Sequence, residues 1–328
     1  EVTTHELRIS GPINDTMSFT AGAFTSDLEL KELNLFNYPG SVGNDITYAP
    51  NYALTDISST GAINNGAAGW FSAGPYSEPV IFFNDIKRTD KQKGIFGEIR
   101  MDVSDTSELT VGARWYDIEV DFEGSANSSF SNGFGNTDQQ KFGTNLSAQY
   151  APGNAGGYPD TAGSDGVIGK ITYSWNPSED LMYYVTWSEG FRPGLLNRPV
   201  GRSNAAGTYS VKPVVESDEV TNLEFGWKAV LADGKLRFNG SAFMVDVSGL
   251  QTTVFDPSIV NLFFSDNAAD AEISGVEGDF IYIPEAEGWT ISGAFSLLNT
   301  EITKSLVPTD DIKVGSDLAF APGIQGNL

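Results

Sequence analysis

Five pairs of segments in this chain alternate apolar and polar residues, and a tight polar turn joins the two members of each pair. This alternation is typical of a β-strand whose faces meet different surroundings, because successive side chains point to opposite sides. Long loops rich in Gly, Asn and Ser separate the pairs. Short turns at one end and long loops at the other are typical of a barrel in a bacterial outer membrane. The sequence therefore predicts an all-β fold, a transmembrane antiparallel β-barrel.

The pattern predicts ten strands, and an eleventh that begins near Leu318 and runs to Leu328. Most exceed the about 9–11 residues that cross a bilayer, which favours a large receptor over a small barrel. The predicted strands are Val2–Ser10, Met17–Leu33, Lys93–Ser104, Glu108–Phe122, Gly166–Asn176, Asp180–Gly190, Asp218–Leu231, Lys235–Ser248, Ala271–Ile283 and Trp289–Ile302. The predicted tight turns are Gly11–Thr16, Asp105–Ser107, Pro177–Glu179, Ala232–Gly234 and Pro284–Gly288. The predicted long loops are Asn34–Lys91, Glu123–Asp165, Phe191–Ser217, Gly249–Asp270 and Thr303–Asp317.

Charged residues fall almost wholly on one face of these segments. Odd-numbered residues of Ile95–Val103 are apolar or glycine, whereas the other face carries Phe96, Glu98, Arg100 and Asp102. A soluble sandwich would also alternate, with its apolar face turned inward, but its connections are usually short at both ends. The long loops therefore favour apolar residues that face lipid and charged residues that line a polar interior.

The phase of the alternation reverses after Tyr116, where Ile118, Val120 and Phe122 become the apolar set. Either a β-bulge or emergence of the strand above the membrane would account for the change.

Aromatic residues on the predicted outer face gather near the tight turns. Such rings favour the headgroup level of a membrane, so they predict an interfacial girdle; the alternative is the general preference of aromatic residues for strands. The predicted girdle is Phe19, Trp175, Tyr183, Trp227, Phe238, Tyr282 and Trp289.

Composition excludes several classes of function. The formal net charge of −24 argues against a nucleic-acid partner, because phosphate binding needs basic clusters. The chain has no cysteine, which excludes disulfides and thiolate metal sites. Glu1–Ser10 lacks the basic start and apolar core of a signal peptide. We therefore expect the chain to be a piece of a longer exported protein.

No motif indicates an enzyme, a metal site or a cofactor. His5, the single histidine, falls on the predicted lipid-facing side of the first strand. The run Ser188–Gly190 lacks the flanking glycines and the strand-to-helix turn of a nucleophile elbow. Gly124–Gly135 does not open a helix, as a phosphate-binding loop would. The acidic residues from Asp266 to Asp279 do not have the spacing of a calcium loop.

Ligand binding is the function that remains, and two loops carry the candidate residues. Arg192, Arg198 and Arg202, together with Asn197, make an island of positive charge in an acidic protein. Guanidinium groups suit carboxylate, catecholate or phosphate ligands; the alternative is that they pair with carboxylates of the lumen or loops. Aromatic residues of the longest loop are candidates for stacking on a ligand, or else pack within the loop. They are Trp70, Phe71, Tyr76, Phe82 and Phe83.

Several stretches resemble the barrel of TonB-dependent outer-membrane receptors. Asp180–Pro199 (DLMYYVTWSEGFRPGLLNRP) resembles the family's strand that leads into an aromatic–Arg–Pro–Gly loop, and Glu216–Gln251 resembles the hairpin with a Leu–Asp–Gly-like turn. Asn267–Ile302 resembles the hairpin after it, Val314–Leu328 the start of a later strand, and Thr3–Ser10 a mid-barrel strand. The similarity spans most of the chain outside the two longest loops.

This resemblance implies that residues 1–328 are about half of a barrel of about 22 strands. The plug domain and the closing strands are absent from this sequence. The implied function is energy-coupled uptake of a scarce solute across the outer membrane, with the TonB complex as a partner that acts through the plug. A ferric siderophore or similar iron chelate is the expected cargo, with cobalamin, haem and carbohydrate left open. Outer-membrane lipid and lipopolysaccharide are the other expected partners. The alternatives are a passive porin and a soluble extracellular β-sheet binding domain.

Overall fold

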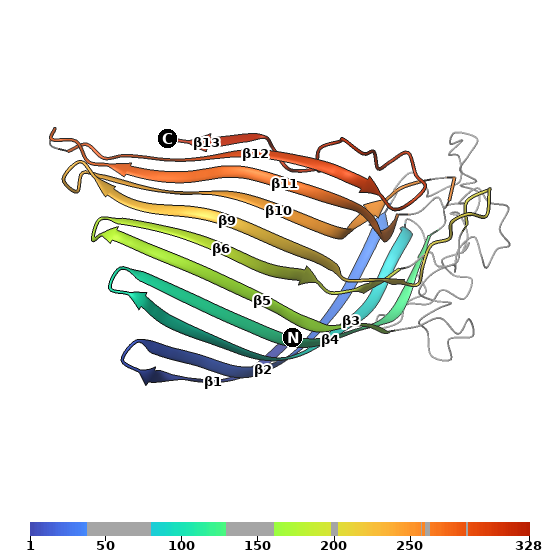
Figure 1. Ribbon diagram of the computed structural model, residues 1–328. Helices are drawn as coiled ribbons and strands as arrows, with labels where there is room; N and C mark the ends of the chain where they lie inside the picture. Colours follow the sequence, from blue (N-terminus) through green and yellow to red (C-terminus); the bar gives the residue numbers. More distant parts are fainter. Residues whose placement is uncertain (38–79, 129–160, 198–202, 257, 260–262, 287) are drawn as a thin grey trace.

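The computed structural model describes residues 1–37, 80–128, 161–197, 203–256, 258–259, 263–286 and 288–328. These residues form one 11-stranded sheet and a separate two-stranded hairpin. All neighbouring strands are antiparallel. None of the described segments is a helix long and apolar enough to cross a membrane. The all-β antiparallel prediction is confirmed, although the strands form a curved open wall without closure (Figure 1).

The strands follow one another around the wall in chain order, and only the small hairpin β7–β8 is left out of the sequence of neighbours. Tight turns lie at one end of the wall and long connections at the other, as predicted (Figure 1). The strands are β1 (Val2–Asn14), β2 (Met17–Asn37), β3 (Val80–Ser104), β4 (Ser107–Ser128), β5 (Thr161–Ser178), β6 (Leu181–Arg192), β7 (Leu195–Leu196), β8 (Val214–Val215), β9 (Asp218–Leu231), β10 (Leu236–Val254), β11 (Phe264–Tyr282), β12 (Ile291–Ser305) and β13 (Ile324–Asn327).

Several strands reach further into the loop side than the sequence predicts. The strand predicted from Lys93 begins at Val80, and the one predicted to end at Phe122 continues to Ser128. The next strand begins at Thr161 instead of Gly166. Where the side chains are described, the outer face of these extensions carries Lys87, Thr89 and Lys91 on β3 and Thr161, Gly163 and Asp165 on β5, and no apolar row. The pattern that identifies a membrane strand is therefore missing there, while backbone pairing continues. The predicted bounds of the long loops were therefore too wide.

The end of the chain also differs from the prediction. The final strand starts at Ile324, six residues after the predicted Leu318, and it pairs with β12 through Ala294–Leu297. Before it, the chain makes turns in which Phe320 has a positive φ of 61°. A positive φ interrupts the extended backbone that a β-strand needs. The final strand therefore begins after Phe320 instead of at Leu318.

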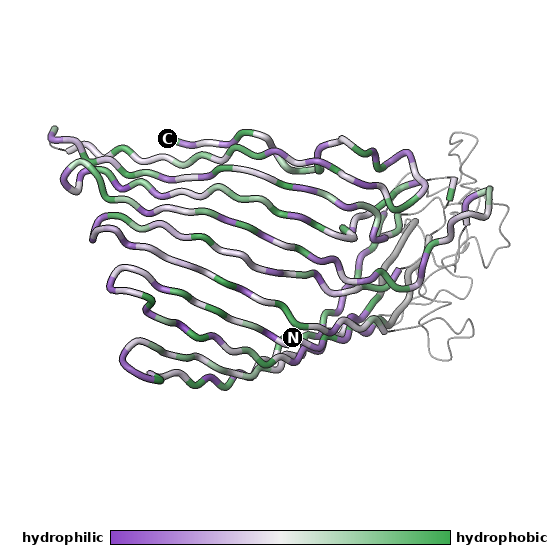
Figure 2. Tube along the Cα trace, in the orientation of Figure 1, coloured by the Kyte–Doolittle hydropathy of each residue, from purple (hydrophilic) through white to green (hydrophobic). Residues whose placement is uncertain are grey.

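Hydrophobic and hydrophilic residues alternate along the strands of the wall (Figure 2), and the register of the strands places them on opposite faces, as the alternation predicts. Ile95, Val103 and Val167 all expose 60% or more of their surface. Ile95 and Val167 are both paired across strands with Trp115, a residue of their own face. We call the side of these residues the outer face and the side of Glu98 and Arg100 the inner face.

The outer face carries a continuous row of aromatic rings near the tight turns. Ring centroids lie 6.0 Å apart for Trp175 and Tyr183, and 5.9 Å apart for Tyr183 and Phe225. The row continues through Trp227 to Phe238 at 6.3 and 5.6 Å. Four of these five rings belong to the predicted girdle, which indicates an ordered belt at the membrane boundary.

The phase reversal after Tyr116 involves no bulge. β3 and β4 stay in register from Asp102–Glu108 to Phe82–Ser128, and β4 and β5 from Ser107–Trp175 to Asp121–Thr161. Past this point the inner face is buried, with Ile118 and Val120 exposing 4% and 2% of their surface. The strand keeps its geometry while its surroundings change, which agrees with emergence above the membrane.

The connection between β6 and β9 covers this part of the inner face. We call its described residues, 193–197 and 203–217, the inward loop. Leu196 of β7 packs with Ile86 and Ala162, and β7 contacts β4 and β5 while β8 contacts β11. The inward loop therefore crosses the inner face from β4–β5 to β11 and packs against Ile86 and Ala162, whereas Ile118 and Val120 pack with Ile168 and Phe191.

The ladder between β5 and β6 ends before the strands do. Its last pair on the loop side is Lys170–Ser188, although β5 continues to Thr161 beside β4 alone. Beyond it, the Gly169 N–H donates to Oε2 of Glu189 at 2.8 Å, and the rings of Tyr116 and Phe191 stack at 3.7 Å. Side chains thus replace the backbone ladder along this seam.

Candidate functional site

The candidate site is the inner face of the wall together with the inward loop above it. Its first element is the anchor at the base of that loop. Asp218 is fully buried and accepts hydrogen bonds from the Arg192 backbone N–H at 3.0 Å and from Nε of Arg192 at 2.7 Å. Nη2 of Arg192 completes the ion pair with Asp218. Charge-assisted bonds of this kind are about twice as strong as neutral ones, so both ends of the loop are held together.

Gln251 of β10 ties the same anchor to the wall. Its backbone N–H donates to Asp218 at 3.2 Å, and its carbonyl accepts from Nη2 of Arg192 at 2.9 Å. Its side-chain amide donates to the carbonyls of Pro193 and Glu216, both at 2.9 Å. One side chain thus satisfies backbone groups at both ends of the inward loop.

Asn197 and Asn267 hold the rest of the inward loop to β11. Asn197 exposes 3% of its surface; its Oδ1 accepts the Ser265 N–H at 2.8 Å, and its Nδ2 donates to the carbonyl of Lys212 at 2.9 Å. Asn267 accepts the Glu216 N–H at 2.9 Å and donates back to the Glu216 carbonyl at 2.9 Å. These contacts replace the backbone partners that an irregular segment lacks.

A second buried polar contact joins the inward loop to β11. The Tyr209 hydroxyl donates to Oδ2 of Asp266 at 2.5 Å, and Asp266 exposes 1% of its surface. Burial first, and then the hydrogen bond to Asp266, raise the pKa of Tyr209. Nζ of Lys212 lies 3.8 Å from the same carboxylate. Around this pair, apolar residues of three loop-side segments, among them Val211, Phe264 and Ile312, form a small core.

The arginine island is only partly within the described residues. Arg192 pairs with a carboxylate at the base of the loop, which is the alternative to ligand binding that the sequence left open. Asn197 is buried and bound to backbone groups. Arg198 and Arg202 lie outside the described residues, as do Trp70, Phe71 and Tyr76.

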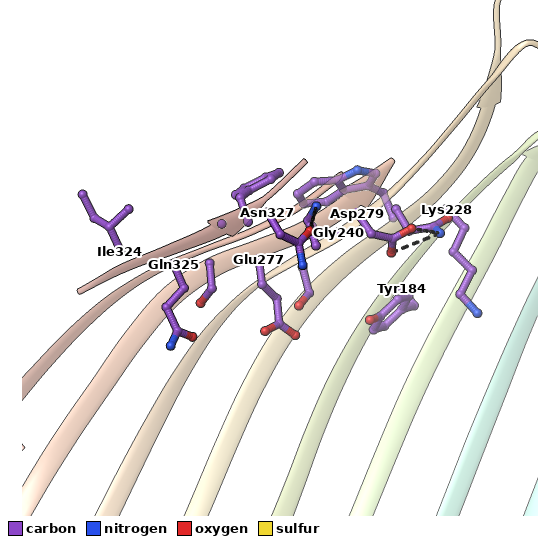
Figure 3. A pocket seen from close by; sticks show the side chains of 16 residues that line it. Tyr184, Lys228, Gly240, Glu277, Asp279, Ile324, Gln325 and Asn327 are labelled. Atoms are coloured by element: carbon purple, nitrogen blue, oxygen red, sulfur yellow. Dashed lines mark hydrogen bonds between the residues drawn. The ribbon is translucent and has the colours of Figure 1, made fainter. Parts of the chain in front are cut away.

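Below the inward loop, towards the tight turns, the inner face is polar and forms a hollow of about 900 Å³ against β9–β13. Tyr184, Lys228, Glu277 and Gln325 lie on one side of the sheet there (Figure 3). The Tyr184 hydroxyl donates to Glu224 at 2.5 Å. The Asn239 amide donates to Asp279 at 3.2 Å. Amides, hydroxyls and carboxylates of this kind can hydrogen-bond a polar surface placed against the wall.

Two phenylalanines and two arginines occupy the inner face of β1–β4. Arg8 lies over the ring of Phe96 at 5.5 Å from the centroid, and Arg114 lies over the ring of Phe24 at 4.6 Å. Sequence reasoning placed Phe96 on the charged face without assigning it a role. The signal that it missed is a phenylalanine opposite a glycine on a face where polar residues are expected.

The part of the chain that the structure describes has no cluster of metal-ligating side chains. No group of three or more His, Asp or Glu side chains there could hold a metal ion. His5 is exposed and shares the outer face with Leu7, as predicted. It has no acidic neighbour across the ladder, where its partner is Thr25.

Solved structures of outer-membrane transporters share this architecture at low identity. The ferric yersiniabactin uptake receptor FyuA from Yersinia pestis is 14% identical with a TM-score of 0.61, and the match covers 98% of this chain and 38% of FyuA. The siderophore receptor PiuA from Acinetobacter baumannii is 18% identical with a TM-score of 0.57, over 99% of this chain and 42% of PiuA. The copper transporter OprC is 13% identical with a TM-score of 0.56, over 99% of this chain and 40% of OprC. The chain thus spans less than half the length of each.

The match to a family model covers nearly the whole chain, residues 6–328, and its description is "TonB dependent receptor-like, beta-barrel". Membership of this family confirms three predictions: the chain is part of a barrel wall, it resides in the bacterial outer membrane, and it is not an enzyme. The outer apolar face, the aromatic row and the loop-side emergence agree with that placement. The chain therefore belongs to the β-barrel family of TonB-dependent receptors.

Proposed function

We propose that this chain is the barrel segment of a receptor that binds a scarce solute outside the cell and imports it with energy from the TonB complex. The observation that carries the proposal is the inward loop, anchored over a polar inner face by Asp218 and Gln251. A wall whose loop side is partly covered, and whose interior is polar, suits selective capture better than free diffusion. The plug domain through which TonB acts would belong to the longer protein.

An iron chelate is the cargo that we propose, with a ferric siderophore as its most suitable form. Support comes from the names of the similar structures, which include the siderophore receptors FyuA and PiuA. OprC is a copper transporter with the same wall, so the fold alone does not select the metal. The loop residues Arg198, Arg202, Trp70, Phe71 and Tyr76 remain the proposed first contacts of an anionic chelate, and Arg192 and Asn197 would position the loop that carries two of them.

Uptake by the full-length receptor tests the proposal. A strain that lacks its other siderophore receptors is supplied with radiolabelled iron as an anionic siderophore complex, with and without a functional TonB complex. We expect accumulation that requires both the receptor and TonB. Uptake that persists without TonB would instead indicate a passive porin, the alternative architecture.

The loop arginines give a finer test of the cargo. Arg198→Ala combined with Arg202→Ala is expected to weaken binding of an anionic chelate, because two cationic contacts are lost. Binding of an uncharged chelate should stay unchanged and serves as the control. Equal affinity of the variant and the unaltered receptor for the anionic chelate would remove these residues from the site.

A further inference from the structure

The seam between β5 and β6 leaves a backbone edge without a ladder on the loop side of the wall. The last backbone pair is Lys170–Ser188, although both strands continue beyond it, β5 to Thr161 and β6 to Arg192. β4 stays paired with β5 to the end of β5, and β9 stays paired with β6 to the end of β6. Each strand is therefore held from one side only along the seam.

The unpaired backbone groups of β5 belong to its odd-numbered residues. The Gly169 N–H points across the seam, because it donates to Oε2 of Glu189 at 2.8 Å. The direction of the backbone groups alternates along a strand, so the N–H groups of Gly163, Asp165 and Val167 also face the seam. These three have no hydrogen-bond partner among the described residues. We call Gly163, Asp165 and Val167 the open edge.

The open edge is accessible from the outer face of the wall. On the inner side, the ring of Phe191 stacks on Tyr116, and the Gly194 N–H of the inward loop donates to Oγ of Ser164 at 2.9 Å. These contacts close the seam towards the interior. On the outer side, all three residues of the open edge are exposed. A partner can therefore reach this edge from outside the cell, at the level where the strands emerge from the membrane.

Carboxylates surround the open edge on the outer face. Asp165 is paired across the ladder with Asp117 of β4, and Glu119 follows Asp117 on the same face. Glu189 is exposed on β6, across the seam. Nζ of Lys93 lies 3.9 Å from Asp117, whereas the other three have no ion pair in the described part of the chain. Like charges placed directly opposite each other are unfavourable, so cationic side chains beside them would be stabilised.

We propose that the open edge binds an extended cationic segment of an extracellular polypeptide by strand addition. The segment continues the sheet and exchanges backbone hydrogen bonds with β5. Its residues alternate, with lysine or arginine on the outer side beside the carboxylates and apolar side chains on the inner side beside Ile168 and Phe191. This interaction goes beyond the proposed function and does not depend on which solute is imported.

A synthetic peptide in which lysine and valine alternate, acetylated and amidated at its ends, is the probe. Its binding to the purified full-length receptor in neutral detergent is measured by fluorescence anisotropy. We expect saturable binding, and none for a control peptide in which glutamate replaces lysine. Absence of binding by the lysine peptide would overturn the proposal, and equal affinity for the two peptides would overturn the selection for positive charge.

Gly163 offers a matched pair of variants that separates the backbone from the side chain. A Cβ at this position meets nothing within 4 Å, so Gly163→Ala should bind the lysine peptide as the unaltered receptor does. Gly163→Pro removes the N–H that faces the seam and leaves the bonds to β4, so it should weaken binding about tenfold. Equal affinity of the two variants would exclude strand addition. Unfolding on heating in detergent checks that both barrels are intact.

The carboxylates are tested by a double variant that keeps the shape of the side chains. Asp165→Asn combined with Glu189→Gln should weaken binding of the lysine peptide severalfold, and the difference should shrink as salt is added. Asp105→Asn combined with Glu179→Gln, at the tight turns, removes the same number of charges far from the seam and should leave binding unchanged. If both double variants bind alike, the carboxylates at the seam do not select the partner.

Hydrogen exchange resolved to single residues locates the site in the unaltered receptor. The Asp165 and Val167 N–H groups should exchange fast in the receptor alone and slowly with the lysine peptide. The N–H groups of Ser164 and Gly166 face β4, so they should exchange slowly in both states and serve as the internal reference. Slow exchange of Asp165 and Val167 without the peptide would show that the edge is already covered, and the proposal would be wrong.

Discussion

The turn-side and loop-side halves of β3–β5 share one unbroken ladder and yet bury opposite faces. On the turn side, Ile95, Trp115 and Val167 expose their apolar surface outward, and charged residues face inward. On the loop side, Ile118 and Val120 are buried inward, whereas Lys93 and Glu119 are exposed on the outer face. The backbone does not distinguish the two halves, so the difference lies in what covers each face.

Two separate coverings account for the contrast. Lipid can cover only the outer face, and it favours apolar side chains there. Above the lipid, the inner face is covered by the inward loop, whose Leu196 and Val214 pack with Ile86 and Ala162, and by Phe191, which packs with Ile118 and Val120. On β4 the boundary between the lipid-covered part and the loop-covered part therefore falls between Trp115 and Asp117, which are successive residues of the outer face.

The largest effect is expected from a charge on the loop-side inner face. Ile118→Asp would leave a carboxylate without a partner in a buried apolar cluster, which costs about 3–5 kcal/mol. Because Phe191 at the end of β6 packs against that cluster, we expect the end of β6, from which the inward loop starts, to loosen. Hydrogen exchange of residues 193–197 in the full-length receptor measures this. Glu119→Ala on the exposed face is the control, and equal exchange in both variants would contradict the assigned burial.

A charge on the turn-side outer face should have the next largest effect. Ile171→Arg would place a guanidinium in the apolar band midway between Trp175 and Asp165, at a cost of about 2–4 kcal/mol. Urea unfolding of the full-length receptor in lipid vesicles measures the loss. Asp165→Arg, on the same face of the same strand but above the boundary, should cost about 0–1 kcal/mol. Similar losses for the two variants would show that lipid does not end where the residue pattern changes.

Removal of the anchor charge should have a moderate effect. Asp218→Asn weakens the bonds to Arg192 and Gln251, and hydrogen bonds to charged groups contribute about 1.5–3 kcal/mol each. We expect a loss of stability at the lower end of this range, because the Arg192 side chain is half-exposed and water replaces part of the interaction. Faster proteolysis within residues 203–217 is the expected readout. Glu219→Gln, an exposed neighbour, should leave the cleavage rate unchanged.

The smallest effect is expected inside the polar hollow on the turn side. Tyr184→Phe removes the hydrogen bond to Glu224, a net contribution of about 0.5–1.5 kcal/mol, reduced by water in the lumen. Urea unfolding should shift only slightly. A loss as large as that of Ile171→Arg would mean that the inner face is dry, contrary to its polar residues.

Sequence reasoning predicted the membrane half well because lipid imposes one rule on every strand. The β9 bounds, Asp218–Leu231, are identical to the prediction, and the outer-face rings Trp175, Tyr183 and Trp227 lie in one row. Above the membrane no single rule applies. The polar stretch around Lys87–Lys93 therefore resembles a loop, although it is paired on both sides.

The candidate site was less predictable for a related reason. Arg192 was identified by its charge, but its partner Asp218 lies 26 residues further along, and only the pairing of β6 with β9 brings the two together. Asn197 looked like part of a polar binding loop, whereas its contact with Ser265 depends on how the inward loop crosses the wall. The charge and type of each residue can be read from the sequence, but the residue that it contacts in the folded chain cannot.

The seam between β5 and β6 has a mechanical consequence. Because the ladder stops at Lys170–Ser188, force on the inward loop passes through Arg192 and Asp218 into β9 and β10 and reaches β5 only through side-chain contacts. The two sides of the rim are therefore coupled by side chains and by the inward loop, whereas the strands below the seam are joined by a continuous backbone ladder.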